Sequence, residues 1–213
     1  MENPSKDSFS TPAYPDQAEL RIKGSRFIAS IYPISSEREA WDVIKEISSD
    51  YRDATHNCYA FKLDTGERIK VRSSDAGEPS GTAGSAILSV IDHSGITNVM
   101  VIVTRYFGGT KLGVGPLRRA YRDSAKAVIE KCGQKTKYHT NRFSFSVPYT
   151  LLKEVKKVLR IVEAVIVSQR FDEAVEYTVD VRKSLSKEFQ EKLKQLMKGE
   201  SPTRVEKNNN KIL

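Results

Sequence analysis

The sequence predicts an α+β protein built from two domains. Its 213 residues suffice for two small domains, and 38% hydrophobic with 29% charged residues is ordinary for a chain that buries a core. Strand-like and helix-like patterns alternate along the chain, and a β-α-β-β-α-β order starts after Gly133. We therefore expect a flexible N-terminus over 1–17, a first domain over 18–134, a second domain over 135–206 and a tail over 207–213.

The first half of the first domain should contain paired strands around one helix. Strands are predicted over residues 18–23, 26–34, 57–63 and 68–73. Asp64-Thr65-Gly66 is a hairpin signal between the last two of them. Ser36 and Glu39 have the spacing of a capping box at the start of a helix. The buried face of that helix is predicted to carry Ala40, Trp41, Ile44 and Ile47.

The second half of this domain combines two glycine-rich loops, two helices and a buried strand. A loop rich in Gly and Ser over 74–84 precedes a helix over 86–94. The continuous apolar run over 99–103 predicts a central strand that is covered on both faces. Pro116 marks the expected start of an amphipathic helix that extends to about Lys131.

The second domain has the order of a ferredoxin-like split motif. Strands are predicted over residues 137–147, 162–169, 174–181 and 203–206, and helices over 150–159 and 184–197. In the first of these helices the apolar positions share one face, so Lys153, Lys156 and Lys157 point outward. These lysines either serve solubility or extend a binding surface.

Composition limits the classes of function. Lys and Arg number 35 against 27 Asp and Glu, a net charge of +8, which favours a polyanionic partner. No apolar run is long enough for a membrane span, and the polar N-terminus does not have the pattern of a signal peptide. Cys58 and Cys132 match no zinc spacing and are expected to be buried free thiols. We expect a cytoplasmic protein without metal or cofactor.

The glycine-dense stretch before the amphipathic helix is a candidate anion site. Gly108, Gly109 and Gly113 allow the backbone to approach a ligand closely, and they lie between a buried strand and a helix N-terminus. Exposed amides and the helix dipole attract anions at such a position, where Thr110 and Lys111 also lie. A tight turn without a ligand is the alternative. The spacing is neither that of a Walker A loop nor that of a dinucleotide fingerprint.

Arginines follow the loop along the exposed face of the helix. Arg118, Arg119 and Arg122 lie opposite its apolar face, where they could hold phosphates or simply be solvated. Arg105 and Tyr106 lead into the loop, and Phe107, although able to stack on a base, is expected to pack in the core. The candidate nucleic-acid or anion site is therefore Arg105, Tyr106, Gly108, Gly109, Thr110, Lys111, Gly113, Arg118, Arg119 and Arg122.

A second group of polar residues is a candidate for contact with a ligand or partner. It comprises His56, Glu78, Ser80 and Thr82. Glu78 is expected to pair with Arg105 or to cap a helix, since Asp75 and Glu78 have no third ligand for a metal. His56 and Cys58 share a strand face, but no orienting carboxylate can be named for a nucleophile pair. No catalytic residues are predicted, and an enzyme is the less favoured class.

Three segments carry a family resemblance: residues 54–60 (ATHNCYA), 75–84 (DAGEPSGTAG) and 105–113 (RYFGGTKLG). They resemble the signature blocks of the Impact/YigZ family. The resemblance implies that the first domain has the ribosomal S-five domain-2-like fold, with the left-handed β-α-β unit of elongation factor G domain IV. It implies that the second domain is similar to domain V of that factor. Animal and fungal members have an additional N-terminal domain, whose kinase-regulating role we do not expect here.

The resemblance links the chain with translation control and with nucleic-acid binding. The leading hypothesis is thus an RNA- or ribosome-binding regulator or accessory factor of translation, which holds phosphates with the glycine loop and the arginine face. An enzyme acting on a phosphorylated small molecule or nucleotide through the same loop is one alternative. A regulatory module that binds a protein partner is the other.

Overall fold

The computed structural model describes residues 7–197, 199 and 201–205, which form two compact units. Phe9–Lys137 is the N-terminal unit, and the described residues from Tyr138 onward, with Asp7 and Ser8, are the C-terminal unit. The boundary therefore falls slightly beyond the predicted residue 134, and the predicted tail lies outside the described residues. Over the part described, no helix has the length and apolar character needed to cross a bilayer.

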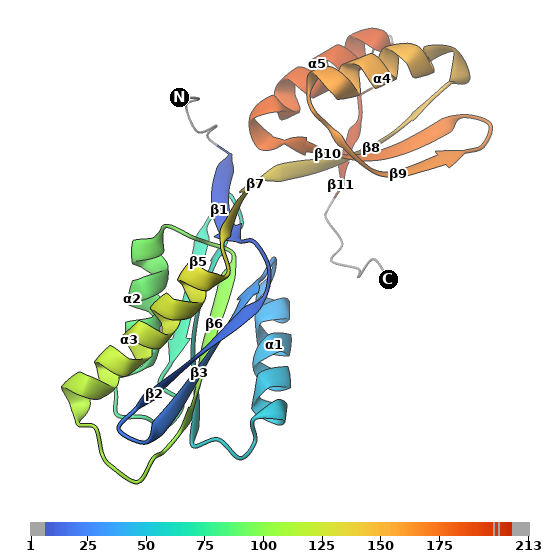
Figure 1. The fold of residues 1–213 in the computed structure, drawn as a ribbon. Helices are drawn as coiled ribbons and strands as arrows, with labels where there is room; N and C mark the ends of the chain where they lie inside the picture. The colour runs from blue at the N-terminus through green and yellow to red at the C-terminus, as the bar shows by residue number, and fades with distance from the viewer. Residues whose placement is uncertain (1–6, 198, 200, 206–213) are drawn as a thin grey trace. The chain divides into compact units, whose positions relative to one another are not determined.

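A five-stranded antiparallel sheet is the centre of the N-terminal unit (Figure 1). Its strands, in spatial order, are β2 (Asp16–Ile22), β3 (Ser25–Pro33), β6 (Val99–Tyr106), β4 (His56–Asp64) and β5 (Ile69–Ser74). The predicted central strand is confirmed, because β6 lies in the middle and only its last residue, Tyr106, is not fully buried. Successive side chains of a strand point to opposite faces, so an unbroken apolar run requires a core on each side.

Helices supply those two cores (Figure 1). Helix α1 (Glu37–Asp50) covers one face, while α2 (Gly84–Ser94) and α3 (Val114–Lys131) cover the other. Val101 of β6 packs with α2 and α3 in the larger core, whereas Met100 packs on the side of α1. The N-terminal unit is thus a three-layer α/β/α arrangement with its glycine loops at the strand ends.

Two helix starts differ in detail from the sequence prediction. Ser36 caps α1 by accepting the Glu39 N–H at 3.1 Å, but the Glu39 carboxylate accepts from the Ser35 N–H instead of completing the box at Ser36. Trp41, predicted to be buried, is 41% exposed. Helix α3 starts at Val114, ahead of Pro116, and tolerates the proline because N–H groups of the first turn have no intrahelical partner.

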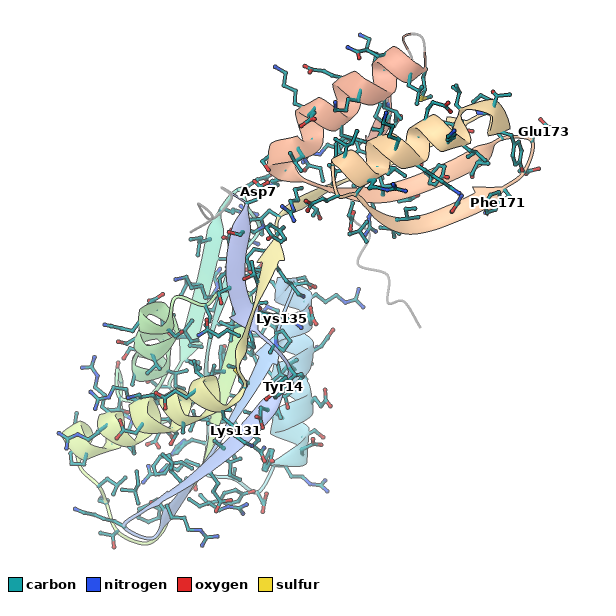
Figure 2. All side chains as sticks on the ribbon, turned by 45° about the horizontal axis from the view of Figure 1, so that its top comes forward. Asp7, Tyr14, Lys131, Lys135, Phe171 and Glu173 are labelled. Atoms are coloured by element: carbon teal, nitrogen blue, oxygen red, sulfur yellow. The ribbon has the colours of Figure 1, made fainter. Side chains whose placement is uncertain are left out.

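The N-terminal segment predicted to be flexible contains a strand. Strand β1 (Ser8–Pro12) pairs with β7 (Gln134–Tyr138) in a two-stranded sheet, so the prediction for residues 1–17 is wrong in this part. Figure 2 marks Tyr14, Lys131 and Lys135 along this region, where the Lys135 ammonium donates to the Ala13 carbonyl at 2.6 Å. The long strand predicted over 137–147 is consequently divided into β7 and β8.

The C-terminal unit has the predicted ferredoxin-like arrangement. Its elements are β8 (Thr140–Val147), α4 (Leu152–Ile161), β9 (Val165–Phe171), β10 (Val175–Arg182), α5 (Ser186–Leu196) and β11 (Thr203–Val205). The antiparallel sheet has the order β11-β8-β10-β9, which is the strand order 4-1-3-2 of the split β-α-β motif. Alternate residues of β10, such as Tyr177 and Val179, pack with Phe143 and Phe189 into a one-sided core under the two helices.

We predict that Gly108→Ala destabilises the N-terminal unit by about 3 kcal/mol or more. A Cβ at Gly108 would lie 1.9 Å from the carbonyl carbon of Gly24. Relieving this clash requires the backbone to shift, which costs more free energy than moving a flexible side chain. Gly115→Ala is the matched control, because a Cβ there meets nothing within 4 Å. Urea unfolding measures both, and equal stability of the two variants would contradict the prediction.

Candidate functional site

The three segments that resemble the family blocks meet at one end of the N-terminal sheet. Strand β4 begins where its antiparallel neighbour β6 ends, so His56 lies opposite Arg105. Strand β5 ends at Ser74, opposite Tyr59 of β4, and the chain then enters the loop before α2. Residues far apart in the sequence therefore form one site by sheet pairing.

A buried carboxylate joins these segments. Arg105 donates through Nη1 to Glu78 Oε1 at 2.6 Å, and the two side chains are only 6% and 3% exposed. The Tyr121 hydroxyl of α3 donates to the same oxygen at 2.7 Å, and His56 Nε2 lies 3.8 Å from Glu78 Oε2. The predicted pairing of Glu78 with Arg105 is confirmed. The expectation that Arg105 contacts a phosphate must be corrected, because its charge is buried and already neutralised.

Asp75 has a structural role at the start of α2. Its carboxylate accepts the backbone N–H groups of Gly81, Ala83 and Gly84 at 2.8–2.9 Å. Burial favours the neutral acid, but the three hydrogen bonds outweigh it and hold the pKa of Asp75 below its ordinary value. Asp75 is thus a helix cap, and within the described residues no group of three potential ligands exists for a metal.

The remaining candidates of the loop before α2 divide into one buried and one exposed residue. Thr82 is buried, and its hydroxyl donates to the Pro79 carbonyl at 2.6 Å, so it shapes the loop. Ser80 is exposed and stays available for contact. Sequence reasoning placed both in one contact group because spacing does not reveal which side chain turns inward.

Cys58 does not have the character of a nucleophile. Its thiol is completely buried and donates to the Asp75 carbonyl at 2.9 Å. Burial raises its pKa to about 12, so the reactive thiolate is absent near neutral pH. His56 Nδ1 is engaged with the Ala76 carbonyl at 2.9 Å. A Cys-His reaction centre is therefore not supported by this geometry.

The glycine loop is exposed and leads directly into α3. Residues 107–111 are all exposed, while Leu112 is buried and anchors the loop. Gly113, with φ of +80°, is the N-cap of α3, and neither a capping side chain nor an acidic residue lies in its described first turn. Pro116 has no N–H and the Leu117 N–H donates to the Gly113 carbonyl at 3.0 Å, so the amides without a side-chain cap at the positive end of the dipole are those of the exposed Val114 and Gly115.

A cavity of about 260 Å³ lies between α2 and α3. Ala86 and Ser89 of α2 line it, together with Gly115, Arg118, Arg119 and Arg122 of α3. Arg122 contacts the neighbouring Asp123 at 3.3 Å, a weak exposed pair, whereas Arg118 and Arg119 form no ion pair in the described part of the chain. We call these six residues the arginine pocket.

Apart from Arg105, which is buried in the ion pair with Glu78, the predicted site residues lie in different environments. Arg118, Arg119 and Arg122 gather in the arginine pocket, and Gly108, Gly109, Thr110 and Lys111 are exposed in the preceding loop. Tyr106 is half-buried, and its hydroxyl donates to Asp53. The contribution of Ala86 and Ser89 was missed, because only the tertiary packing brings α2 against α3.

Phe107 was expected in the core and is instead 47% exposed. Its ring lies over the guanidinium of Arg105, with 5.6 Å between Arg105 Cζ and the ring centroid. Phe107 follows the last residue of β6, so it lies beyond the part of the strand whose side chains point into a core.

Comparisons with known proteins agree with this architecture. Residues 23–129 match the model of the Impact N-terminal domain, and residues 145–200 match a domain of unknown function, DUF1949. A crystal structure of a hypothetical protein covers 96% of this chain and 99% of its own, with a TM-score of 0.70 and 25% identity. The chain is therefore a two-domain α+β protein with an Impact-type first domain.

Bacterial relatives define the family further. IMPACT family member YvyE of Bacillus subtilis (strain 168) is 33% identical over 194 residues, covering 91% of this chain and 89% of that protein. IMPACT family member YigZ of Escherichia coli (strain K12) is 26% identical over 194 residues, covering 91% and 95%. The chain belongs to the IMPACT family.

We predict that Glu78→Gln lowers the free energy of unfolding by about 3 kcal/mol, because it leaves the Arg105 charge buried without a counter-charge. The double variant Glu78→Gln with Arg105→Met should lose less than the sum of the two single variants. Ser80→Ala, an exposed change in the same loop, is the control. Urea unfolding near pH 7 measures all four, and an additive double variant would show that the pair is not coupled.

The cap at α2 generates a pH-dependent prediction. A depressed folded pKa means that Asp75 stabilises the fold above its ordinary pKa of 3.8 and loses this contribution as the pH falls through the folded value. Asp75→Asn should therefore cost about 1–2 kcal/mol at pH 7 and progressively less below pH 3.8. Urea unfolding of both proteins at several pH values tests this, and a constant difference would contradict it.

Proposed function

We propose that this protein is an RNA- or ribosome-binding regulator or accessory factor of translation. The observation that carries the proposal is the arginine pocket, in which three guanidinium groups and the uncapped start of α3 meet. The link to translation comes from the Impact/YigZ family resemblance. The likeness of the two domains to domains IV and V of elongation factor G is part of this proposal.

Phosphate is the chemical group that fits the pocket best. Arg118 and Arg122 are four residues apart and Arg119 lies between them, so the three side chains project from one face of α3. A guanidinium group binds phosphate oxygens through paired N–H donors, and nearby helix N–H groups add to the attraction. The volume of about 260 Å³ is below the range of about 300–1,000 Å³ typical of small-molecule sites. A phosphate of a longer chain therefore suits it better than a whole nucleotide.

The glycine loop would extend the same contact. Gly108, Gly109, Thr110 and Lys111 are exposed immediately before α3, and Lys111 has no ion pair among the described residues. Backbone amides and one mobile ammonium group would hold the next phosphate along the backbone. Such contacts position a nucleic acid without reading its sequence.

The enzyme alternative has less support from the geometry. None of the six residues of the arginine pocket supplies a carboxylate or an imidazole that could act as a general base or hold a magnesium ion. Cys58, the thiol of the motif region, is buried and protonated. The protein-partner alternative makes a different prediction, namely binding that survives nuclease and moderate salt.

We predict that Arg118→Ala, Arg119→Ala and Arg122→Ala together weaken binding to RNA and to ribosomal subunits and flatten its salt dependence. Each lost phosphate contact reduces the slope of log affinity against log salt by about 0.7 for a single strand, so the triple variant should lose about 2. Fluorescence anisotropy across a salt series measures affinity and slope together.

The matched control is the triple variant Lys153→Ala, Lys156→Ala and Lys157→Ala. It removes the same charge from exposed positions of α4 in the C-terminal unit. If both triple variants lose affinity equally, binding is not specific to the arginine pocket and either follows net charge or extends to α4. If the wild type binds no RNA at low salt, nucleic acid is excluded as the main ligand, and nucleotides and protein partners are screened instead.

A further inference from the structure

Phe107 is an exposed aromatic residue on a backbone that cannot move freely. Its own N–H donates to Thr55 Oγ1 at 3.0 Å, and the next N–H, of Gly108, donates to Ser25 Oγ at 3.1 Å. Gly108 also packs against Gly24 so closely that no Cβ would fit. Three separate contacts thus hold the chain at and directly after Phe107, although the residue is 47% exposed.

The ring rests on a buried cation. The Arg105 guanidinium lies 5.6 Å from the centroid of Phe107 and 5.5 Å from that of Phe27, between the exposed ring and the core. Glu78 fixes the guanidinium from the side at 2.6 Å. Arg105 therefore lies over one face of the Phe107 ring, while 47% of the residue remains exposed to solvent.

The buried Arg105–Glu78 pair that supports Phe107 is not the most stable way to fill this part of the core. Burying an ion pair requires desolvation of both charges, and a hydrophobic pair of similar volume is often at least as stable. Arg105 Nε is moreover buried with no hydrogen-bond partner among the described residues. Local violations of this kind concentrate at functional positions. A single exposed Phe is common on protein surfaces and needs no explanation. Phe107 differs because a buried ion pair, which is costly to desolvate, lies under its ring.

The charge around Phe107 is suited to a polyanion. Lys23 is exposed in the turn that brings Gly24 against Gly108, and Lys111 is exposed in the glycine loop. Neither forms an ion pair in the described ranges 7–197, 199 and 201–205. Proteins hold single-stranded nucleic acid by combining exposed cations with aromatic side chains on which bases stack.

We propose that Phe107 is a stacking platform for an unpaired base of single-stranded RNA. This inference rests on the proposed function and adds the class of RNA. Bases inside a duplex are already stacked on each other, whereas an unpaired base can turn out and lie on an aromatic ring. The arginine pocket would hold the phosphates of the same strand.

The test compares a labelled single-stranded uridine oligonucleotide of about 12 residues with an RNA duplex of equal length. Phe107→Ala should weaken binding of the single strand by about 5-fold to 150-fold. Duplex binding and the salt slope should remain unchanged, because no phosphate contact is lost. Phe171→Ala is the matched control, since Phe171, marked in Figure 2, is 62% exposed in the C-terminal unit.

Phe107→Trp provides a second readout. It should retain the affinity of the wild type, and its added indole fluorescence should be quenched by the single strand but not by the duplex. The wild type, whose one tryptophan is Trp41, gives the background signal. Thermal unfolding of each variant establishes that the fold is intact.

The outcomes separate the two proposals. If Phe107→Ala binds the single strand as tightly as the wild type, or loses duplex binding to the same extent, the stacking platform is overturned. If the triple arginine variant keeps its affinity and salt slope while Phe107→Ala loses affinity, the arginine pocket fails and the platform stands. If the wild type binds neither RNA, both proposals fall.

Discussion

The Glu78 carboxylate accepts from Arg105 of β6 and from Tyr121 of α3, and it lies beside His56 of β4. It belongs to a segment without regular structure, so these contacts, together with the cap at Asp75, hold that segment against the end of the sheet. Because α2 begins where the segment ends, the same carboxylate helps to fix the start of α2, which then packs beside α3 in the larger core. The arginine pocket, which both helices line, therefore rests on a buried ion pair that lies outside it.

Periodicity in the sequence predicts most of the fold because the strongest patterns coincide with the largest cores. The apolar run of β6 and the apolar face of α3 both predict burial that the structure confirms. The split β-α-β order of the C-terminal unit follows from strand and helix signals of ordinary length. Strand β1 was not predictable in this way, because it is short and polar and its partner β7 lies more than a hundred residues along the chain.

Sequence reasoning reversed the environments of Arg105 and Phe107, and the reason is physical. Hydrophobicity assigns a phenylalanine to the core and an arginine to solvent, and this holds unless a charged group finds a partner. The partner of Arg105 is Glu78, which lies in a different segment. The pairing was one of two expected roles of Glu78, but no local spacing signals that both side chains are buried. The Arg105 guanidinium occupies the end of the core. The ring of Phe107 therefore lies over the outer side of this guanidinium and not inside the core.

Helix α3 connects the buried network to the exposed arginines. Tyr121 points inward to Glu78, and the helical period places Arg119 nearly opposite it, with Arg118 and Arg122 on the exposed surface between them. The rotation of α3 about its axis is set by its whole buried face, which includes Tyr121 and packs into the larger core. The direction in which the arginines face is therefore a consequence of the core, not of the loop that precedes them.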